Sequence, residues 1–191
     1  AARRHIDDVG FLREIIDDLA SKGIINDRVS VADVTSGYVS AGASALSVLT
    51  DQSFFGGRKE DLLQAREINQ IPILRKDFML DEYQLLEAKA WGADIILLIA
   101  SILTPLQVQS LARFAKSLGL NVLLEVHNLE ELERSLCDEL DAVGVNNRNL
   151  GNFEVTVEHS YNLLSKIPEQ FLKISESGLS DPQTVTDLKK E

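Results

Sequence analysis

Short apolar runs alternate with amphipathic stretches along the chain. The runs are ALSVL (45–49), IPIL (71–74), DIILLIA (94–100), NVLLEV (121–126), DAVGV (141–145) and FLKIS (171–175). Residues that commonly begin or end helices stand between them: Ser30, Asp81, Gly92, Thr104, Pro105, Gly119, Asp181 and Pro182. They predict helices over 31–41, 82–91 and 105–118, and another that starts at 182. The alternation of strand and helix favours βαβ units around a parallel sheet.

The run DIILLIA supports a parallel sheet. Its residues are apolar at consecutive positions, so both faces of the strand would be buried. Two α/β architectures fit this succession of elements: a (β/α)8 TIM barrel and a doubly wound open sheet. No G-x-G-x-x-G motif follows any of the runs, which counts against a dinucleotide-binding open sheet.

Most of the predicted strands carry polar residues at their carboxyl ends. Side chains alternate along a strand, so Lys76 and Phe78 share one side of the second run. By the same rule Asn146 and Arg148 share one side of the fifth, and Glu125 ends the fourth. In a (β/α)8 barrel these strand ends converge on one mouth, where the chemistry takes place. The pattern therefore predicts a cluster in space from residues scattered along the chain.

The residue types in this cluster suit acid–base chemistry on an anionic substrate. A lysine and a glutamate, Lys76 and Glu125, would tune each other's pKa in a water-poor pocket and exchange protons with a substrate. Arg148 could grip a carboxylate or phosphate with two parallel hydrogen bonds. Ser177 and Gly178 stand just ahead of a predicted helix start and could offer backbone N–H groups to a phosphate.

Structural explanations compete with some of these roles. Lys76 and Asp77 could form a surface ion pair worth about 0–1 kcal/mol. Glu125 is harder to explain in this way, since an unpaired carboxylate at a buried strand end is costly. Arg75 and Asp77 would point away from Lys76 and have a structural role. His127 is expected at the rim or behind the site residues rather than as a metal ligand, because no second histidine lies at ligand spacing.

Composition narrows the classes of function. Of the 191 residues 45% are hydrophobic, as in a globular core, and the net charge of −11 disfavours nucleic-acid binding. Cys137 is the only cysteine, which excludes an intrachain disulfide and fits a reducing cytosol, and we expect it to pack within a helix. The longest apolar run, Ile95 to Ala100, is too short to cross a bilayer. We therefore expect a soluble, cytoplasmic protein with no membrane or nucleic-acid partner.

Five segments together resemble the indole-3-glycerol phosphate synthase family. They are SALSVLTDQSFFGG, IPILRKDFMLDEYQLLEAKAWGADIILLIASIL, VLLEVHNLEELE, VGVNNRNL and ISESGLSDP. The family is a (β/α)8 TIM barrel of tryptophan biosynthesis. It converts 1-(2-carboxyphenylamino)-1-deoxyribulose 5-phosphate to indole-3-glycerol phosphate with loss of CO₂ and water. The resemblance implies a lyase that uses no metal and no organic cofactor.

The resemblance also implies roles for individual residues. Lys76 would be the general acid of ring closure, and Glu125 the partner carboxylate for proton transfer in the dehydration. Asn146 would belong to the catalytic set and help to position the anthranilate ring. The remaining residues would bind substrate: Arg148 at its carboxylate, Phe55 and Phe78 at its aromatic ring, and Ser177 and Gly178 at its phosphate.

The two ends of the chain depart from the family pattern. Residues 1–20 have apolar positions at helical spacing, so we expect an atypical N-terminal helical segment there and a partial barrel over 21–191. This barrel would have about six clear βα units, an unsupported first strand and no eighth strand. Open edges could drive self-association. The alternative function is a catalytically impaired, truncated or engineered barrel fragment that acts as a folding or assembly module.

Overall fold

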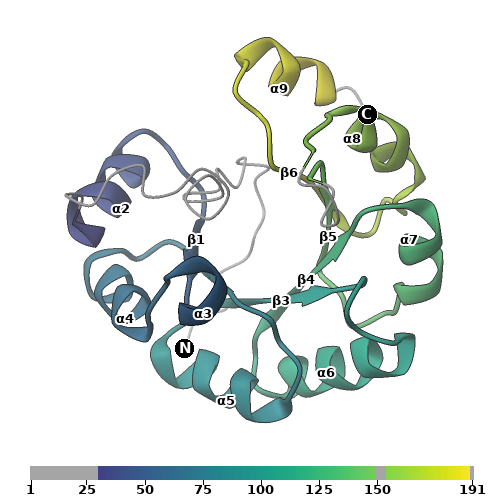
Figure 1. Ribbon diagram of the computed structural model, residues 1–191. Helices are drawn as coiled ribbons and strands as arrows, with labels where there is room; N and C mark the ends of the chain where they lie inside the picture. The colour runs from purple at the N-terminus through teal and green to yellow at the C-terminus, as the bar shows by residue number, and fades with distance from the viewer. Residues whose placement is uncertain (1–29, 149–153, 190–191) are drawn as a thin grey trace. The chain divides into compact units, whose positions relative to one another are not determined.

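Helices and strands alternate along the chain in the computed structural model (Figure 1). The structure describes residues 30–148 and 154–189, except for the side chains of residues 54 and 55. The predicted helix within residues 1–20 lies outside the described residues. The elements are α2 (Val31–Ser40), β1 (Leu46–Leu49), α3 (Gln52–Phe55), α4 (Lys59–Ile68), β2 (Ile73–Lys76), α5 (Glu82–Trp91), β3 (Ile95–Ile99), α6 (Pro105–Ser117), β4 (Asn121–Val126), α7 (Leu129–Ser135), β5 (Ala142–Asn146), α8 (Glu158–Leu163), the 3-10 helix η1 (Leu164–Lys166), β6 (Leu172–Glu176) and α9 (Pro182–Leu188).

The strands are parallel and follow the chain in the order β1-β2-β3-β4-β5-β6. This succession of βα units is the connectivity of a (β/α)8 barrel, in which each helix returns the chain to the next parallel strand. The fold class predicted from the sequence is therefore confirmed. The chain divides into two compact units, and β3 contributes residues to both.

The first unit extends to Leu97 and holds β1, β2, α2, α4 and α5. In its parallel ladder Leu46 is paired with Ile73, and Leu49 with Lys76. Its core is formed by fully buried aliphatic side chains from strands and helices: Leu46, Leu62, Ile73, Leu85 and Ile96. The helices contribute because their apolar residues recur at helical spacing, as Leu62 and Ala65 do in α4.

The second unit holds β4, β5 and β6 with α6, α7, α8 and α9. Glu125 is paired with Gly144 across β4 and β5, and Asn146 with Glu176 across β5 and β6. Residues of β4 and β5 are buried at consecutive positions, which is typical of parallel strands covered on both faces. The polar residues of interest stand at the carboxyl ends of these strands.

Helix ends follow the predicted signals. The Ser30 side chain accepts a hydrogen bond from the Asp33 N–H at the start of α2, and Asp81 accepts one from Tyr83 at the start of α5. Gly92 ends α5 in the left-handed conformation, with a φ of 92° that favours glycine. One prediction was wrong: α7 ends at Ser135, so Cys137 lies in the connection to β5 rather than within a helix.

None of the helices in the described part of the chain combines the length and apolar character that a bilayer crossing requires.

Candidate active site

In the first unit, Lys76 is the last residue of β2, and its neighbours on either side point to the opposite face. Arg75 is 3% exposed and its Nη2 lies 2.8 Å from Oδ2 of Asp77. Thr50 binds both partners: Arg75 Nε donates to its hydroxyl at 2.9 Å, and the hydroxyl donates to Asp77 at 2.7 Å. Asp77 thus pairs with Arg75 inside the protein. The structural role predicted for Arg75 and Asp77 is confirmed.

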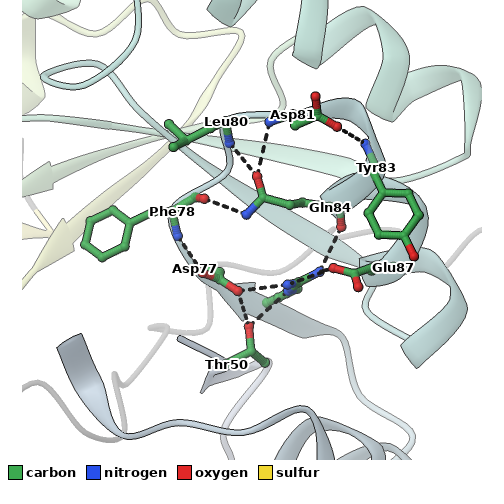
Figure 2. A network of polar contacts seen from close by, with 9 residues as sticks. Thr50, Asp77, Phe78, Leu80, Asp81, Tyr83, Gln84 and Glu87 are labelled. Atoms are coloured by element: carbon green, nitrogen blue, oxygen red, sulfur yellow. Dashed lines mark hydrogen bonds and ion pairs between the residues drawn. The ribbon is translucent and has the colours of Figure 1, made fainter. Parts of the chain in front are cut away.

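The network continues into the loop that follows β2 (Figure 2). Gln84 of α5 accepts hydrogen bonds from Leu80 N–H and Asp81 N–H through Oε1, at 2.7 and 3.1 Å. Its Nε2 donates to the Phe78 carbonyl at 2.8 Å, and its own carbonyl accepts from Arg75. One side chain therefore ties the loop of residues 78–81 to the helix behind it. This fixes the path of the backbone on both sides of Lys76 and Phe78.

Phe78 lies just beyond the tip of β2. Its N–H donates to Asp77 Oδ1 at 2.8 Å, while its ring projects away from the polar network (Figure 2). The ring is partly exposed. Phe55 is the last residue of α3, and its side chain lies outside the described structure.

In the second unit, three polar side chains share one face at the carboxyl ends of adjacent strands. The parallel register pairs Asn146 with Glu176, and Glu125 with Gly144, two residues before Asn146. Glu125 and Glu176 are each 3% exposed and Asn146 is 6% exposed. Two carboxylates and an amide are thus gathered at one buried strand end. Such a site can hold positive charge or exchange protons.

Gly144 provides the space that Glu176 occupies. A Cβ atom at position 144 would collide with Oε1 of Glu176. The absence of a side chain on β5 therefore lets the carboxylate of β6 lie across the neighbouring strand, on the face that also carries Glu125.

His127 stands directly behind Glu125. Its Nε2 lies 3.4 Å from Glu125 Oε1, and its Nδ1 lies 3.2 Å from Glu131 Oε2 on α7. Burial lowers the pKa of His127, but the hydrogen bond with Glu131 and the charges of both carboxylates raise it more, so that it lies above its ordinary value. Burial raises the pKa of Glu131, but its hydrogen bonds with His127 outweigh this and hold it below its ordinary value.

A buried amide supports the turn after β6. Asn147 is fully buried, and its Nδ2 donates to the Ser175 hydroxyl and to the Ser177 carbonyl, both at 3.1 Å. Its Oδ1 accepts from the N–H and the hydroxyl of Ser160 at 3.1 and 2.9 Å. Ser177 and Gly178 then adopt consecutive left-handed conformations, with φ of 66° and 73°. Successive N–H groups in such turns can form a concave site for an anion.

Arg148 lies immediately beyond β5. Its N–H donates to Asn146 Oδ1 at 2.9 Å, and it forms an antiparallel bridge with Val155. Arg148 and Asn146 are thus coupled through the backbone. Within residues 30–148 and 154–189, no group of three or more histidine, cysteine, aspartate or glutamate residues is arranged to hold a metal ion.

Comparison with known proteins decides the family. A sequence model described as indole-3-glycerol phosphate synthase matches residues 2–191. This chain belongs to the indole-3-glycerol phosphate synthase family. An indole-3-glycerol phosphate synthase of Bacteroides thetaiotaomicron is 46% identical over 182 residues, which are 95% of this chain and 70% of that protein. One of Polaromonas sp. is 46% identical over 170 residues, or 89% of this chain and 64% of that protein.

Solved structures share the fold at much lower identity. The 3-hexulose-6-phosphate synthase of Salmonella typhimurium matches with a TM-score of 0.64 at 17% identity. The matched region covers 85% of this chain and 80% of that protein. A mutant tryptophan synthase alpha-subunit of Pyrococcus furiosus has a TM-score of 0.62 at 16% identity and covers 84% and 76%. These likenesses support the fold alone. Membership of the indole-3-glycerol phosphate synthase family does not favour the alternative of a folding or assembly module.

The residues predicted for the family's site fall in both units. Lys76 and Phe78 lie at the tip of β2 in the first unit. The others lie at strand ends of the second unit: Glu125, Asn146, Arg148, Ser177 and Gly178. Glu176 and Asn147 stand among the polar residues at the predicted strand ends, but no role was predicted for either. Glu176 could have been found from its strand parity, since it lies two residues beyond Ile174 on the same face. No comparable signal marks Asn147, whose partner Ser160 lies 13 residues further on.

Proposed function

We propose that this chain carries indole-3-glycerol phosphate synthase activity. The substrate is a phosphorylated small molecule, 1-(2-carboxyphenylamino)-1-deoxyribulose 5-phosphate. The products are indole-3-glycerol phosphate, CO₂ and water. The observation that carries the proposal is the strand-end face with buried Glu125, Glu176 and Asn146, in a chain that matches the synthase family from residue 2 to residue 191.

Ring closure needs a proton donor and a site for positive charge. The ring carbon that bears the carboxylate attacks the ketone carbon, a C–C bond forms, and Lys76 donates its proton to the ketone oxygen. The ring system then carries an iminium-like positive charge, which buried carboxylates such as Glu125 stabilise. The bond to the carboxylate breaks next. Its electron pair returns to the ring, CO₂ leaves, and the aromatic ring is restored.

Dehydration completes the indole. After ring closure Lys76 regains a proton from solvent, and it donates this proton to the hydroxyl group on the new ring carbon, which leaves as water. Glu125 accepts a proton from the neighbouring CH₂ carbon, and the remaining electron pair forms the double bond. The strand-end position of Lys76 and the burial of Glu125 suit these roles.

The remaining site residues bind the two anionic ends and the ring of the substrate. Asn146 and Arg148 orient the anthranilate ring and its carboxylate. Phe78, and with it Phe55, packs against the aromatic face. Ser177 and Gly178 contribute half of the phosphate site through their backbone N–H groups, since both are held in left-handed conformations.

The location of the protein in the cell and its oligomeric state are expected from the sequence. The cytoplasmic location and the self-association expected through open edges stay predictions. Size-exclusion chromatography with light scattering would test self-association. A single monomeric mass at all concentrations would contradict it.

Turnover of the substrate is the direct test of the function. We expect the purified chain to convert the substrate to a product with indole fluorescence. Lys76→Ala should lower kcat by about 10²–10⁴-fold, the usual contribution of a general acid. Lys166→Ala is the matched control, because Lys166 is an exposed residue of η1. Product formation that survives Lys76→Ala, or that never occurs with the wild-type chain, would refute the proposal.

A further inference from the structure

The imidazole of His127 lies between two carboxylates. Nε2 faces Glu125 Oε1 at 3.4 Å, and Nδ1 faces Glu131 Oε2 at 3.2 Å. The side chains of His127, Glu125 and Glu131 are 13%, 3% and 13% exposed. All three belong to the second unit. The proposed acid–base mechanism leaves this histidine without a task, although it is the side chain directly behind Glu125.

Glu131 is fixed independently of the imidazole. The N–H of His127 donates to Glu131 Oε2 at 2.9 Å, and Asn128 Nδ2 donates to Glu131 Oε1 at 3.0 Å. Asn128 in turn caps α7, because its Oδ1 accepts from the Glu131 N–H at 2.9 Å. The carboxylate of Glu131 is therefore preorganised by the start of the helix. It sets the orientation of the ring rather than adapting to it.

A histidine that faces a carboxylate on each nitrogen is satisfied best as an imidazolium ion. A neutral ring has one N–H donor, so its other nitrogen would direct a lone pair at a carboxylate oxygen. The charged groups around the ring, among the described residues of this unit, are Glu125 from β4 and Glu131 from α7. Arg134, also on α7, donates instead to the Ala100 carbonyl at 2.8 Å. The pKa of His127 accordingly lies above its ordinary value.

The contact with Glu125 is close but incompletely formed. His127 Nε2 is buried and makes no hydrogen bond within the described structure, although Glu125 Oε1 lies at ion-pair distance. Hydrogen bonds of catalytic groups are often long in a ligand-free site and shorten when the substrate binds.

We propose that His127 is a positioning residue that holds the carboxylate of Glu125 for proton transfer, while Glu131 orients its ring. The arrangement is a carboxylate–imidazolium–carboxylate chain, in which a third group orients the second. The proposal rests on the proposed function through the role of Glu125. His127 touches Glu125 and not the reacting atoms. Its loss should affect turnover more than substrate binding.

Two amide substitutions separate the two contacts. In His127→Asn the amide nitrogen can replace Nδ1 and keep the bond to Glu131. In His127→Gln it reaches the place of Nε2 and keeps a donor toward Glu125. We expect His127→Asn to lower kcat about tenfold with little change in KM, as for other residues that orient a catalytic group. His127→Gln should recover most of the rate. Equal rates in both variants, whether normal or reduced, would overturn the proposal.

The pH profile gives a readout that a purely structural role would not change. The wild-type kcat/KM should fall on the alkaline side as His127 and the general acid Lys76 lose their protons, and the part of this fall that is due to His127 should be absent from both variants. His159→Asn is the control, because His159 lies on α8 and should leave the profile unchanged. An alkaline profile that is the same in the wild type and in His127→Asn would contradict the proposal.

Nuclear magnetic resonance of the imidazole nitrogens tests the contacts without any turnover. We expect the resonances that disappear in His127→Asn to titrate above the ordinary histidine range. Glu125→Gln and Glu131→Gln should each lower the pKa of His127, because each replaces one of the two carboxylates beside the imidazole with a neutral amide. A titration unaffected by Glu125→Gln would overturn the inference even if the chain forms indole-3-glycerol phosphate. If Glu125→Gln lowers the pKa of His127 but the wild-type chain forms no product, the proposed function is refuted instead.

Discussion

Arg75 and Asp77 form a buried ion pair of 2.8 Å on the face of β2 opposite Lys76. The two paired residues flank Lys76, and the N–H of Thr50, the residue that follows β1, donates to the Lys76 carbonyl at 3.1 Å. The backbone at Lys76 is therefore held by the ion pair of its two neighbours and by the hydrogen bond from Thr50. Two structural residues, Arg75 and Asp77, thus alternate along the sequence with Lys76, the residue proposed for catalysis.

We predict that Arg75→Ala destabilises the protein by about 3–5 kcal/mol, because it leaves the Asp77 carboxylate buried without its cation. Urea denaturation would measure the loss. Arg113→Ala is the control. It removes a pair with Glu139 in which Arg113 is 70% exposed, so its effect should stay within about 1 kcal/mol. Similar losses in both variants would show that burial of the pair does not govern its contribution.

We predict that Gly144→Ala lowers kcat by displacing Glu176, since the new Cβ would occupy the place of its carboxylate. Steady-state kinetics and the midpoint of thermal unfolding would measure the effect. Gly37→Ala is the matched control. Gly37 is an exposed residue of α2, and a Cβ atom added there would meet nothing within 4 Å, so alanine should stabilise its helix by up to about 1 kcal/mol. Normal turnover in Gly144→Ala would contradict this interpretation of the strand-end face.

We predict that Asn147→Ala raises KM for the phosphorylated substrate and lowers stability. The substitution removes the donor to the Ser177 carbonyl and leaves buried groups of Ser160 without their acceptor. Each buried group left unpaired costs about 1–3 kcal/mol. Initial rates at varied substrate and chemical denaturation would report the two effects. Asn162→Ala, at an exposed position of α8, should change neither. An unchanged KM would separate Asn147 from the phosphate-binding turn.

We predict a pH window for the contribution of the His127–Glu131 pair to stability. The pKa of His127 is raised above 6.5, so its contribution is complete below that value and is lost as the pH rises through the raised pKa. The pKa of Glu131 is lowered from 4.5, so its contribution is complete above that value and is lost as the pH falls through the lowered pKa. The wild type should therefore exceed His127→Asn in free energy of unfolding by the largest amount between pH 4.5 and pH 6.5. A difference that does not vary with pH would contradict the assignment.

Much of the fold could be predicted from the sequence because its signals are local. Apolar runs such as DIILLIA mark buried parallel strands, and the caps Ser30 and Asp81 with the C-terminal Gly92 mark helix ends. The side of β2 on which Lys76 lies follows from alternation alone. The error at Cys137 arose because a short helix, α7, ends without a glycine or proline signal before Leu136.

The rest of the site depends on contacts between residues far apart in the sequence. Gly144 appears as one more small residue in a strand until the register places Glu176 beside it. Asn147 adjoins a predicted site residue, but its function as a buried hub depends on how α8 is placed behind β5 and β6. His127 was expected behind the site residues. Its second carboxylate could not be inferred, because the contact depends on how the α7 cap directs Glu131.

Trp91 is the one tryptophan in the chain, and the guanidinium of Arg75 lies 4.0 Å from its ring centroid. The protein therefore contains a native fluorophore stacked on the cation that braces the segment around Lys76. Its emission will report the integrity of the first unit, whereas circular dichroism averages over all the helices and strands. A mismatch between the two signals during denaturation would reveal a partly folded species in which one unit has melted ahead of the other.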